Sequence, residues 1–323
     1  MKQNLIDNLG GYFARECQSS GGLAILPIFS NGTADGGYIS LHAALKQGAV
    51  AISEISEGGS VPNLKVQNRG DKAVLLLDGE ELRGAKQNRV LNASILVAAE
   101  SELIIPVSCV ERGRWGYRGR EFSESGNVLP SRQKIVKNED MISNLKTSGE
   151  YRSNQGRVWD EIDRMQMEHD TPSPTSAMDD VYRARGQDLD ELCAAFPLLE
   201  GQIGIYAEIG GQFAGLDLVS RPEVWRDLQV KVVRSYAIDA VTRPVKAHTI
   251  DAGKLDKLFG RLADCDFSSF KSVGIGEDIR LEHDSLIGSA LFWENALIHL
   301  AVYPRRHRAN PERYDSPRNR GPR

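Results

Sequence analysis

The side chains best suited to chemistry are concentrated in one run, from Asp78 to Asn92. The run holds three acids, three bases, three amides and two glycines. A connection between strands needs only about two to five residues. Polar groups concentrated between two strands form many binding and catalytic sites. The run therefore predicts a functional site, with a solvated loop of fortuitous charge as the alternative.

Carboxylates of this region suggest hydrolysis. Glu80 and Glu81 are adjacent, so on an extended segment their side chains point to opposite faces and at most one faces a given pocket. If the apolar runs 90–97 and 103–110 pair as a hairpin, Glu111 lies near the same end as the run of polar residues. Two carboxylates in different environments can hydrolyse a glycosidic bond. The catalytic candidates are Glu81, Glu111 and Glu80.

Basic and amide side chains of the same region could hold an anionic ligand. Lys86 and Arg89 suit a phosphate or pyrophosphate. Gln87 and Asn88 could recognise a base or ribose edge, although amides also stabilise turns. An ion-pair network that braces the loop is the alternative. The expected ligand-binding residues are Lys86, Gln87, Asn88, Arg89, Asn92, Arg112 and Trp115.

Two further segments supply weaker candidates. The glycines of 58–60 could form a backbone anion site beside acids, with a simple loop as the alternative. The segment 274–280 lacks the third glycine and the helix of a dinucleotide-binding fingerprint. The secondary candidates are Glu54, Glu57, Glu277, Asp278 and Arg280.

Positive charge gathers in two places. The segment 112–137 has seven Lys or Arg against two acids, with aromatic residues interleaved. Such a segment suits phosphate clamping and base stacking, so RNA is a candidate partner, with a solvated loop as the alternative. The tail 304–323 has seven arginines against two acids and is expected to be disordered. It could add affinity for a polyanion or simply keep the chain soluble.

No residue pattern requires a metal or another cofactor. The six histidines do not form any metal-binding spacing, and the four cysteines are scattered without a Cys-x-x-Cys pair. A carboxylate-bound Mg²⁺ stays an open alternative, because Mg²⁺ needs few protein ligands. The sequence has neither a catalytic cysteine signature nor a Gly-x-Ser-x-Gly motif.

The elements that must position these residues indicate an α+β fold. Short apolar or alternating runs separated by Gly, Asn, Asp and Ser predict an antiparallel, β-rich part over 1–122. A polar, helix-prone segment follows over 123–200, and a β-hairpin–helix–helix–β layer over 201–304. We expect 1–304 to form one integrated unit and 305–323 to be a disordered basic tail. The first part is expected to contain strands at 23–29, 50–55, 64–67, 73–77, 90–97 and 103–110 and a helix at 41–47.

Local signals mark the later elements. Gly210-Gly211 between two alternating runs predicts a hairpin. Ser220 to Glu223 reads as a capping box that opens a helix reaching Ala240. Further helices are expected at 158–165, 176–184, 189–196 and after Asp251, and three strands at 278–282, 286–292 and 297–303.

Composition fits a cytoplasmic protein. The chain has 323 residues, 41% of them hydrophobic, and can bury a large core. It has no run of about 20 apolar residues and no secretory signal, so we expect no membrane partner. The net charge of −4 argues against generic nucleic-acid binding by the whole body. Nothing here indicates an oligomeric state.

Two long motifs resemble one bacterial and phage family. They are Leu75 to Asn92 and Ile105 to Trp115, supported by Glu54 to Pro62, Gln155 to Trp159 and Ser235 to Ala240. The chain resembles the ADP-ribosylglycohydrolase and rhodanese-phosphatase associated protein domain over roughly residues 20 to 304. The resemblance implies a role near ADP-ribose, NAD-derived nucleotides or RNA repair. We therefore expect recognition, and in one version hydrolysis, of such a ligand. A non-catalytic sensing module and a purely structural motif are the alternatives.

Overall fold

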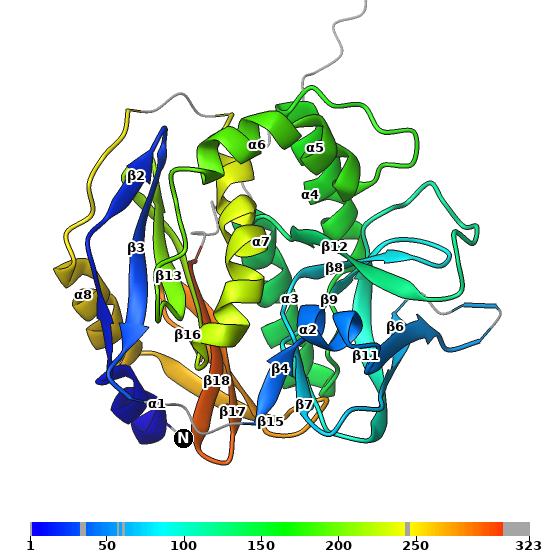
Figure 1. Ribbon diagram of the computed structural model, residues 1–323, viewed down its shortest axis with the longest axis horizontal. Coiled ribbons are helices and arrows are strands. Elements are labelled where there is room, and N and C mark those ends of the chain that lie inside the picture. Colours follow the sequence, from blue (N-terminus) through cyan, green and yellow to red (C-terminus); the bar gives the residue numbers. More distant parts are fainter. Residues whose placement is uncertain (1, 33–36, 57, 60–61, 243–245, 306–323) are drawn as a thin grey trace, which may run out of the picture.

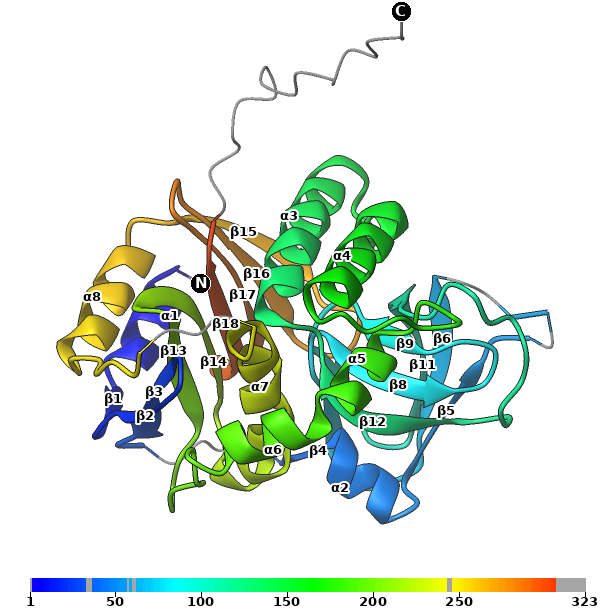
Figure 2. The same cartoon turned by 90° about the horizontal axis from the view of Figure 1, so that it is seen from above.

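The computed structural model describes residues 2–32, 37–56, 58–59, 62–242 and 246–305. A large sheet and a small barrel lie on opposite sides of a layer of helices (Figures 1 and 2). The α+β class with a β-rich N-terminal part is confirmed. Almost all strand pairs are antiparallel, and one pair, β4 with β7, is parallel.

The large sheet mixes strands from both ends of the chain. Its order is β1-β3-β13-β14-β18-β17-β16-β15, with β2 also paired to β3. One face packs against α1 and α8, and the other against α3 and α7. The strands are β1 Tyr12–Ala14, β2 Gln18–Ser20, β3 Leu23–Ser30, β13 Gly204–Ile209, β14 Gln212–Val219, β15 Asp266–Lys271, β16 Glu277–Glu282, β17 Leu286–Trp293 and β18 Ala296–Pro304.

Six strands form the barrel, in the order β12-β8-β9-β11-β6-β5. A bridge between Ser53 and Glu121 joins the two edges of this sheet and closes it. Its apolar interior continues into α2 and a three-stranded sheet, β10-β7-β4, which cover one end. The strands are β4 Tyr38–Ser40, β5 Val50–Glu54, β6 Asn63–Asn68, β7 Ala73–Leu76, β8 Glu80–Gly84, β9 Arg89–Leu91, β10 Ile95–Val97, β11 Ser101–Cys109 and β12 Phe122–Val128.

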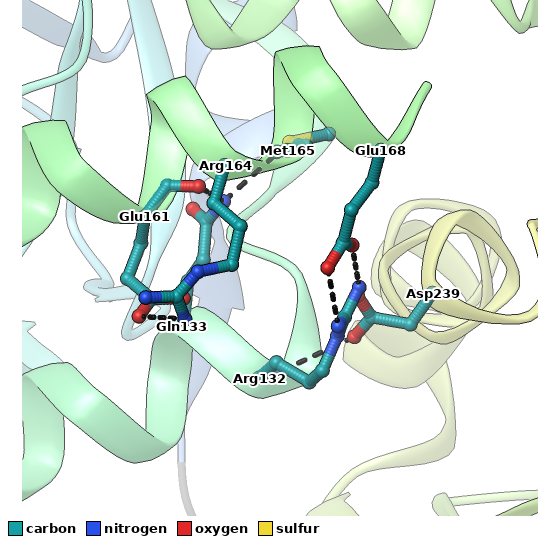
Figure 3. A pocket seen from close by; sticks show the side chains of 7 residues that line it. All are labelled: Arg132, Gln133, Glu161, Arg164, Met165, Glu168 and Asp239. Carbon is teal, nitrogen blue, oxygen red and sulfur yellow. Dashed lines mark hydrogen bonds and ion pairs between the residues drawn. The ribbon is translucent and has the colours of Figure 1, made fainter. Parts of the chain in front are cut away.

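Helices between sheet and barrel are joined by ion pairs as well as by apolar contacts. Arg132 on α3 reaches Glu168 on α4 and Asp239 on α7 (Figure 3). The hollow among these side chains is about 10 Å³, which is room for no more than a water molecule. The helices are α1 Lys2–Leu9, α2 Leu41–Lys46, α3 Ser131–Ser148, α4 Gln155–Glu168, α5 Met178–Ala184, α6 Gly186–Cys193, α7 Pro222–Ala240 and α8 Gly253–Leu262.

Several local predictions are confirmed. The Gly210-Gly211 hairpin joins β13 to β14, and both glycines have positive φ. The helix after Asp251 and the last three strands form where the sequence indicates them.

Two local predictions and one alternative are wrong. The run 90–97 splits into β9 and β10, and only β9 pairs with β11. Ser220 does not cap α7, because its hydroxyl is hydrogen-bonded to the Tyr38 hydroxyl at 2.8 Å. The basic segment 112–137 is not one loop, since it includes β12 and the start of α3. Of the expected disordered tail, 305–323, all residues from 306 onward lie outside the described residues.

Candidate functional site

The end of the barrel away from α2 and the three-stranded sheet, which we call its mouth, holds a buried polar cluster. Arg89 on β9 and Cys109 on β11 are paired across the two strands, so their side chains share one face. Glu54, at the end of β5, meets them from the other side of the barrel. Arg89 and Cys109 are both 0% exposed, and Glu54 is also buried. Small-molecule sites often lie at such a mouth.

Arg89 is the most unusual group in this cluster. Its Nη1 donates to Gln87 Oε1 at 2.9 Å, and the Cys109 thiol donates to the same oxygen at 3.1 Å. Its Nη2 is 4.0 Å from Glu54 Oε1, which is too long for a hydrogen bond. Nε and Nη2 donate no hydrogen bond to any described residue. Burial lowers the pKa of Arg89 below its ordinary value.

Lys86 and two aromatic rings cover the mouth. The Lys86 ammonium is 5.2 Å from the centre of the Trp115 ring and 5.1 Å from that of Tyr117. It also donates to Gly58 O at 2.6 Å. Trp115 is 51% and Tyr117 50% exposed. Each ring is therefore half-exposed to solvent and has at least one cation over it.

Gly59 closes the mouth from the loop after β5. Its φ of +77° favours glycine, and an added Cβ would lie 3.0 Å from Lys86 Cδ and 3.4 Å from Trp115 Cζ2. The backbone therefore favours glycine, and a larger residue would also make the Lys86 side chain shift by a few tenths of an ångström. Glu57 lies outside the described residues.

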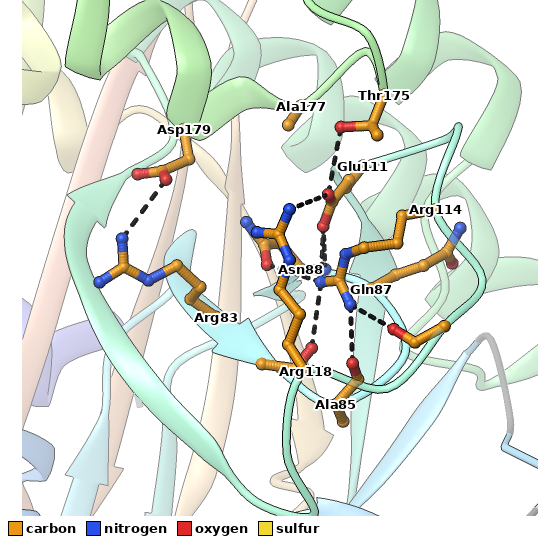
Figure 4. A network of polar contacts seen from close by, with 12 residues as sticks. Arg83, Ala85, Gln87, Asn88, Glu111, Arg114, Arg118, Thr175, Ala177 and Asp179 are labelled. Carbon is orange, nitrogen blue, oxygen red and sulfur yellow. Dashed lines mark hydrogen bonds and ion pairs between the residues drawn. The ribbon is translucent and has the colours of Figure 1, made fainter.

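Glu111 links the start of the segment that carries Trp115 and Tyr117 to the polar run 78–92 (Figure 4). Its Oε2 accepts from Arg114 at 2.7 Å and from the Asn88 backbone N–H at 3.1 Å, and Oε1 accepts from Thr175 at 3.1 Å. Burial alone would raise the pKa of Glu111, but these hydrogen bonds outweigh it and lower the pKa. Arg114 also donates to Ala85 O at 2.7 Å. The two sequence motifs are thus in direct contact.

Glu81 faces away from the barrel interior, towards α5. Its oxygens accept from Asn88 Nδ2 at 3.3 Å and from Asn127 Nδ2 at 3.2 Å. Asn127 also donates to Asp179 at 2.9 Å. Burial, reinforced by the charge of Asp179, raises the pKa of Glu81 to about 7. Asn88 therefore links one carboxyl that favours its neutral form to another, Glu111, that favours its anionic form.

Glu80, Asn92 and Arg112 lie outside these two clusters. Glu80 pairs with Lys231 on α7 at 2.5 Å. Asn92 donates to Tyr151 O at 3.2 Å and borders a separate hollow of about 390 Å³. Arg112 is exposed and pairs with Asp163 on α4.

The remaining predicted groups lie elsewhere. Asp278 and Arg280 form a buried pair that Asn138 also contacts, while Glu277 is exposed at the start of β16. Arg280 shares the interior with Asp78 and with Lys137 on α3, which pair with each other. Lys134 on the same helix is also buried in an ion pair, with Asp217. These two lysines of the basic segment do not reach solvent.

Tyr117, Asn127 and Asp179 are not among the predicted site residues. The alternation Trp115-Gly116-Tyr117 in a basic segment is a usable signal for Tyr117. Asn127 and Asp179 leave no such signal, because they meet Glu81 only through the fold.

The part of the chain that the structure describes has neither a metal-binding cluster nor a membrane-spanning helix. No group of three or more His, Cys, Asp or Glu that could hold a metal ion occurs among the described residues. None of the helices in the described ranges is both long and apolar enough to span a membrane.

Comparison with known proteins identifies the family. Neither the curated proteins nor the solved structures gave a match. The model of one family, the ARG and Rhodanese-Phosphatase-superfamily-associated Protein domain, matches residues 12–303. That range includes the barrel, its mouth, the helical layer and the large sheet. The chain belongs to the ARG and Rhodanese-Phosphatase-superfamily-associated Protein domain family.

Proposed function

We propose that the barrel mouth recognises a nucleotide of the ADP-ribose class: ADP-ribose, an NAD-derived nucleotide or an RNA end that carries phosphate. One observation carries the proposal. The Lys86 ammonium lies over two half-exposed aromatic rings, Trp115 and Tyr117, and the buried Arg89 guanidinium lies 5.9 Å from the centre of the Trp115 ring. Cations bind phosphate, and open ring faces stack on bases.

Family context supports this class of ligand. The family's name associates it with ARG, the ADP-ribosylglycohydrolases, and with the rhodanese-phosphatase superfamily. Proteins named for such an association are expected to handle the same ligands. The proposal places the protein in the cytoplasm, where its four cysteines, which are unpaired, would stay reduced.

Thermal melting against ADP-ribose, NAD and short RNAs tests the proposal. A ligand that binds only the folded state adds about 2.7 kcal/mol at a hundredfold excess over its Kd. We expect the shift in wild type to disappear in Lys86→Ala and Trp115→Ala. Lys65→Ala is the matched control, because Lys65 is half-exposed and pairs with Glu102 on the outer side of the barrel. A panel without any shift in wild type would refute the proposal.

Hydrolysis of the bound nucleotide is the second candidate function. It is favoured by the pair of buried carboxyls linked through Asn88, because Glu81, with a pKa raised to about 7, still holds a proton in part of the molecules near neutral pH, whereas the lowered pKa of Glu111 keeps that carboxyl ionised. A general acid and an ionised partner are what glycosidic hydrolysis requires. We expect Glu81→Gln and Glu111→Gln each to abolish product formation while ligand still raises the melting temperature. Wild type that binds ADP-ribosyl compounds without releasing product would exclude this candidate.

A further inference from the structure

We propose that Arg89 is a receptor for a terminal phosphomonoester, so that the barrel mouth selects nucleotides that end in a phosphate. This inference rests on the proposed function and specifies which part of the ligand enters the barrel.

The hydrogen-bonding state of Arg89 carries the inference. A guanidinium has two donor edges, and the edge formed by Nε and Nη2 presents two parallel N–H groups. Those two nitrogens are the ones without a hydrogen bond to the described residues, whereas Nη1 is occupied by Gln87. Buried polar groups are rarely left unsatisfied in this way. A free edge of this kind matches two oxygens of one phosphate.

The charges around the free edge favour an oxyanion. Among the described residues around the edge, the cations Arg89, Lys86 and Arg114 outnumber the carboxylates Glu54 and Glu111. Glu54 approaches Nη2 only to 4.0 Å, so it balances charge without occupying the edge. An added phosphate would bring hydrogen bonds to a cation that has lost its water.

Burial decides between a terminal and an internal phosphate. Arg89 is 0% exposed, below a cover made by Lys86, Gly59 and Trp115. Only the end of a molecule can enter such a mouth, since an internal phosphate carries chain on both sides. A pyrophosphate in the middle of ADP-ribose therefore does not reach Arg89, whereas a phosphate at either end of a nucleotide does.

Entry requires the cover to rearrange. Lys86 must exchange Gly58 O for a phosphate oxygen, and the half-exposed Trp115 ring must shift from beside Arg89. Binding should therefore change the tryptophan fluorescence, and the part of the change that Trp115→Phe removes reports on the mouth, because the chain has four tryptophans.

The experiment measures, by titration calorimetry, how tightly wild-type protein binds two ligands that differ only by a terminal phosphate. One pair is ADP-ribose and ADP-ribose 1″-phosphate, and the other is a short RNA with a 3′-hydroxyl or a 3′-phosphate. We expect the phosphorylated member of at least one pair to bind tenfold or more tightly, and the pair that responds identifies the source of the phosphate. In Arg89→Lys, which keeps the charge but loses the edge, the preference should fall to less than threefold. Arg164→Lys on the exposed face of α4 is the control for the same exchange.

Each outcome decides the inference. Equal affinity within both pairs would overturn it and leave the proposed function standing, whereas failure of every nucleotide to bind would overturn both. If Arg89→Lys does not fold, the affinities of wild-type protein for the two ligands of each pair still decide. In addition, the change in Trp115 fluorescence must be larger with the phosphorylated ligand than with its unphosphorylated partner. A phosphate preference that Arg89→Lys retains in full would place the receptor elsewhere and refute the inference.

Discussion

At the scale of single residues, the two carboxyls that contact Asn88 differ in their preferred charge. The ordinary pKa of a glutamate is 4.5, and that of Glu81 is raised to about 7 because the carboxyl is fully buried near Asp179. A raised pKa means that the folded state binds the proton more tightly than the unfolded state. Glu81 therefore costs no stability well below pH 4.5; the cost develops between pH 4.5 and about 7 and stays constant above that.

Glu81→Gln should consequently stabilise the protein at alkaline pH. The gain should be near zero at about pH 4 and reach about 3 kcal/mol at about pH 8, from a pKa shift of roughly two units or more. Urea denaturation at both values measures it. A gain that does not grow between the two pH values would contradict the assigned pKa shift.

Glu111→Gln should behave in the opposite way. The pKa of Glu111 is lowered, so its ionised form stabilises the fold above the ordinary value of 4.5, and this contribution is lost as pH falls through the lowered pKa. The substitution should destabilise the protein by about 1–3 kcal/mol at neutral pH, since it weakens the charged hydrogen bonds from Arg114 and Asn88. The loss should shrink in acid, and the same urea titrations report it. A loss that is equally large at about pH 3 would show that packing, and not charge, holds Glu111.

Glu80 and Glu81 illustrate which properties of single residues could be predicted from the sequence. The alternation of a strand places Glu80 and Glu81 on opposite faces, and they do face Lys231 and Asn127 respectively. The identity of those partners was not predictable, because both lie far along the chain. The same applies to Arg89, whose basic character is visible in the sequence but whose complete burial follows from barrel closure.

At the scale of elements, the contact of β8 with β12 depends on one glycine. Gly84 has a φ of +143°, and an added Cβ would lie 2.6 Å from the Glu121 backbone oxygen. Gly84→Ala should cost about 3 kcal/mol or more, because backbone strain adds to a clash that only the backbone can relieve. Gly126→Ala in β12 is the matched control, since its φ is +83° but no atom lies within 4 Å of the added carbon. It should cost only about 1–2 kcal/mol. Equal losses in chemical denaturation would show that strain alone matters.

Elements were predictable where their patterns are local. Hairpins and alternating strands formed where the residues indicated them, as in β13 and β14. No individual helix was predicted at α3, although 123–200 was expected to be helix-prone, because Gln133, Lys134 and Lys137 read as solvated residues. In the structure they are buried on the same helix as apolar residues such as Ile135, Met141 and Leu145. The burial of the two lysines is explained by their partners, Asp217 and Asp78, which lie far from α3 in the sequence.

At the scale of the whole molecule, α3 joins the barrel side to the large sheet through charges. Lys137 pairs with Asp78, at the start of the polar run, and also donates to Asn92 O at 3.0 Å. Lys134 pairs with Asp217 on β14 at 3.2 Å, and Asp217 also accepts from Tyr236 and Tyr303. These groups are all buried, so each charge depends on its partner. We therefore propose that residues 1–304 unfold as one unit.

The Asp217→Asn substitution tests whether residues 1–304 unfold as one cooperative unit. Loss of the carboxylate leaves the buried Lys134 ammonium without its counter-charge, which should cost about 3–5 kcal/mol. If sheet and barrel form one cooperative unit, the slowest-exchanging amides of β11 in the barrel should lose the same free energy of protection as those of β14 beside the substitution. Native-state hydrogen exchange measures both. Lys65→Ala removes a half-exposed pair with Glu102 and should change either by less than about 1 kcal/mol. Barrel protection that stays at the wild-type value in Asp217→Asn would show that barrel and sheet unfold separately, and the charges on α3 would then stabilise only the sheet.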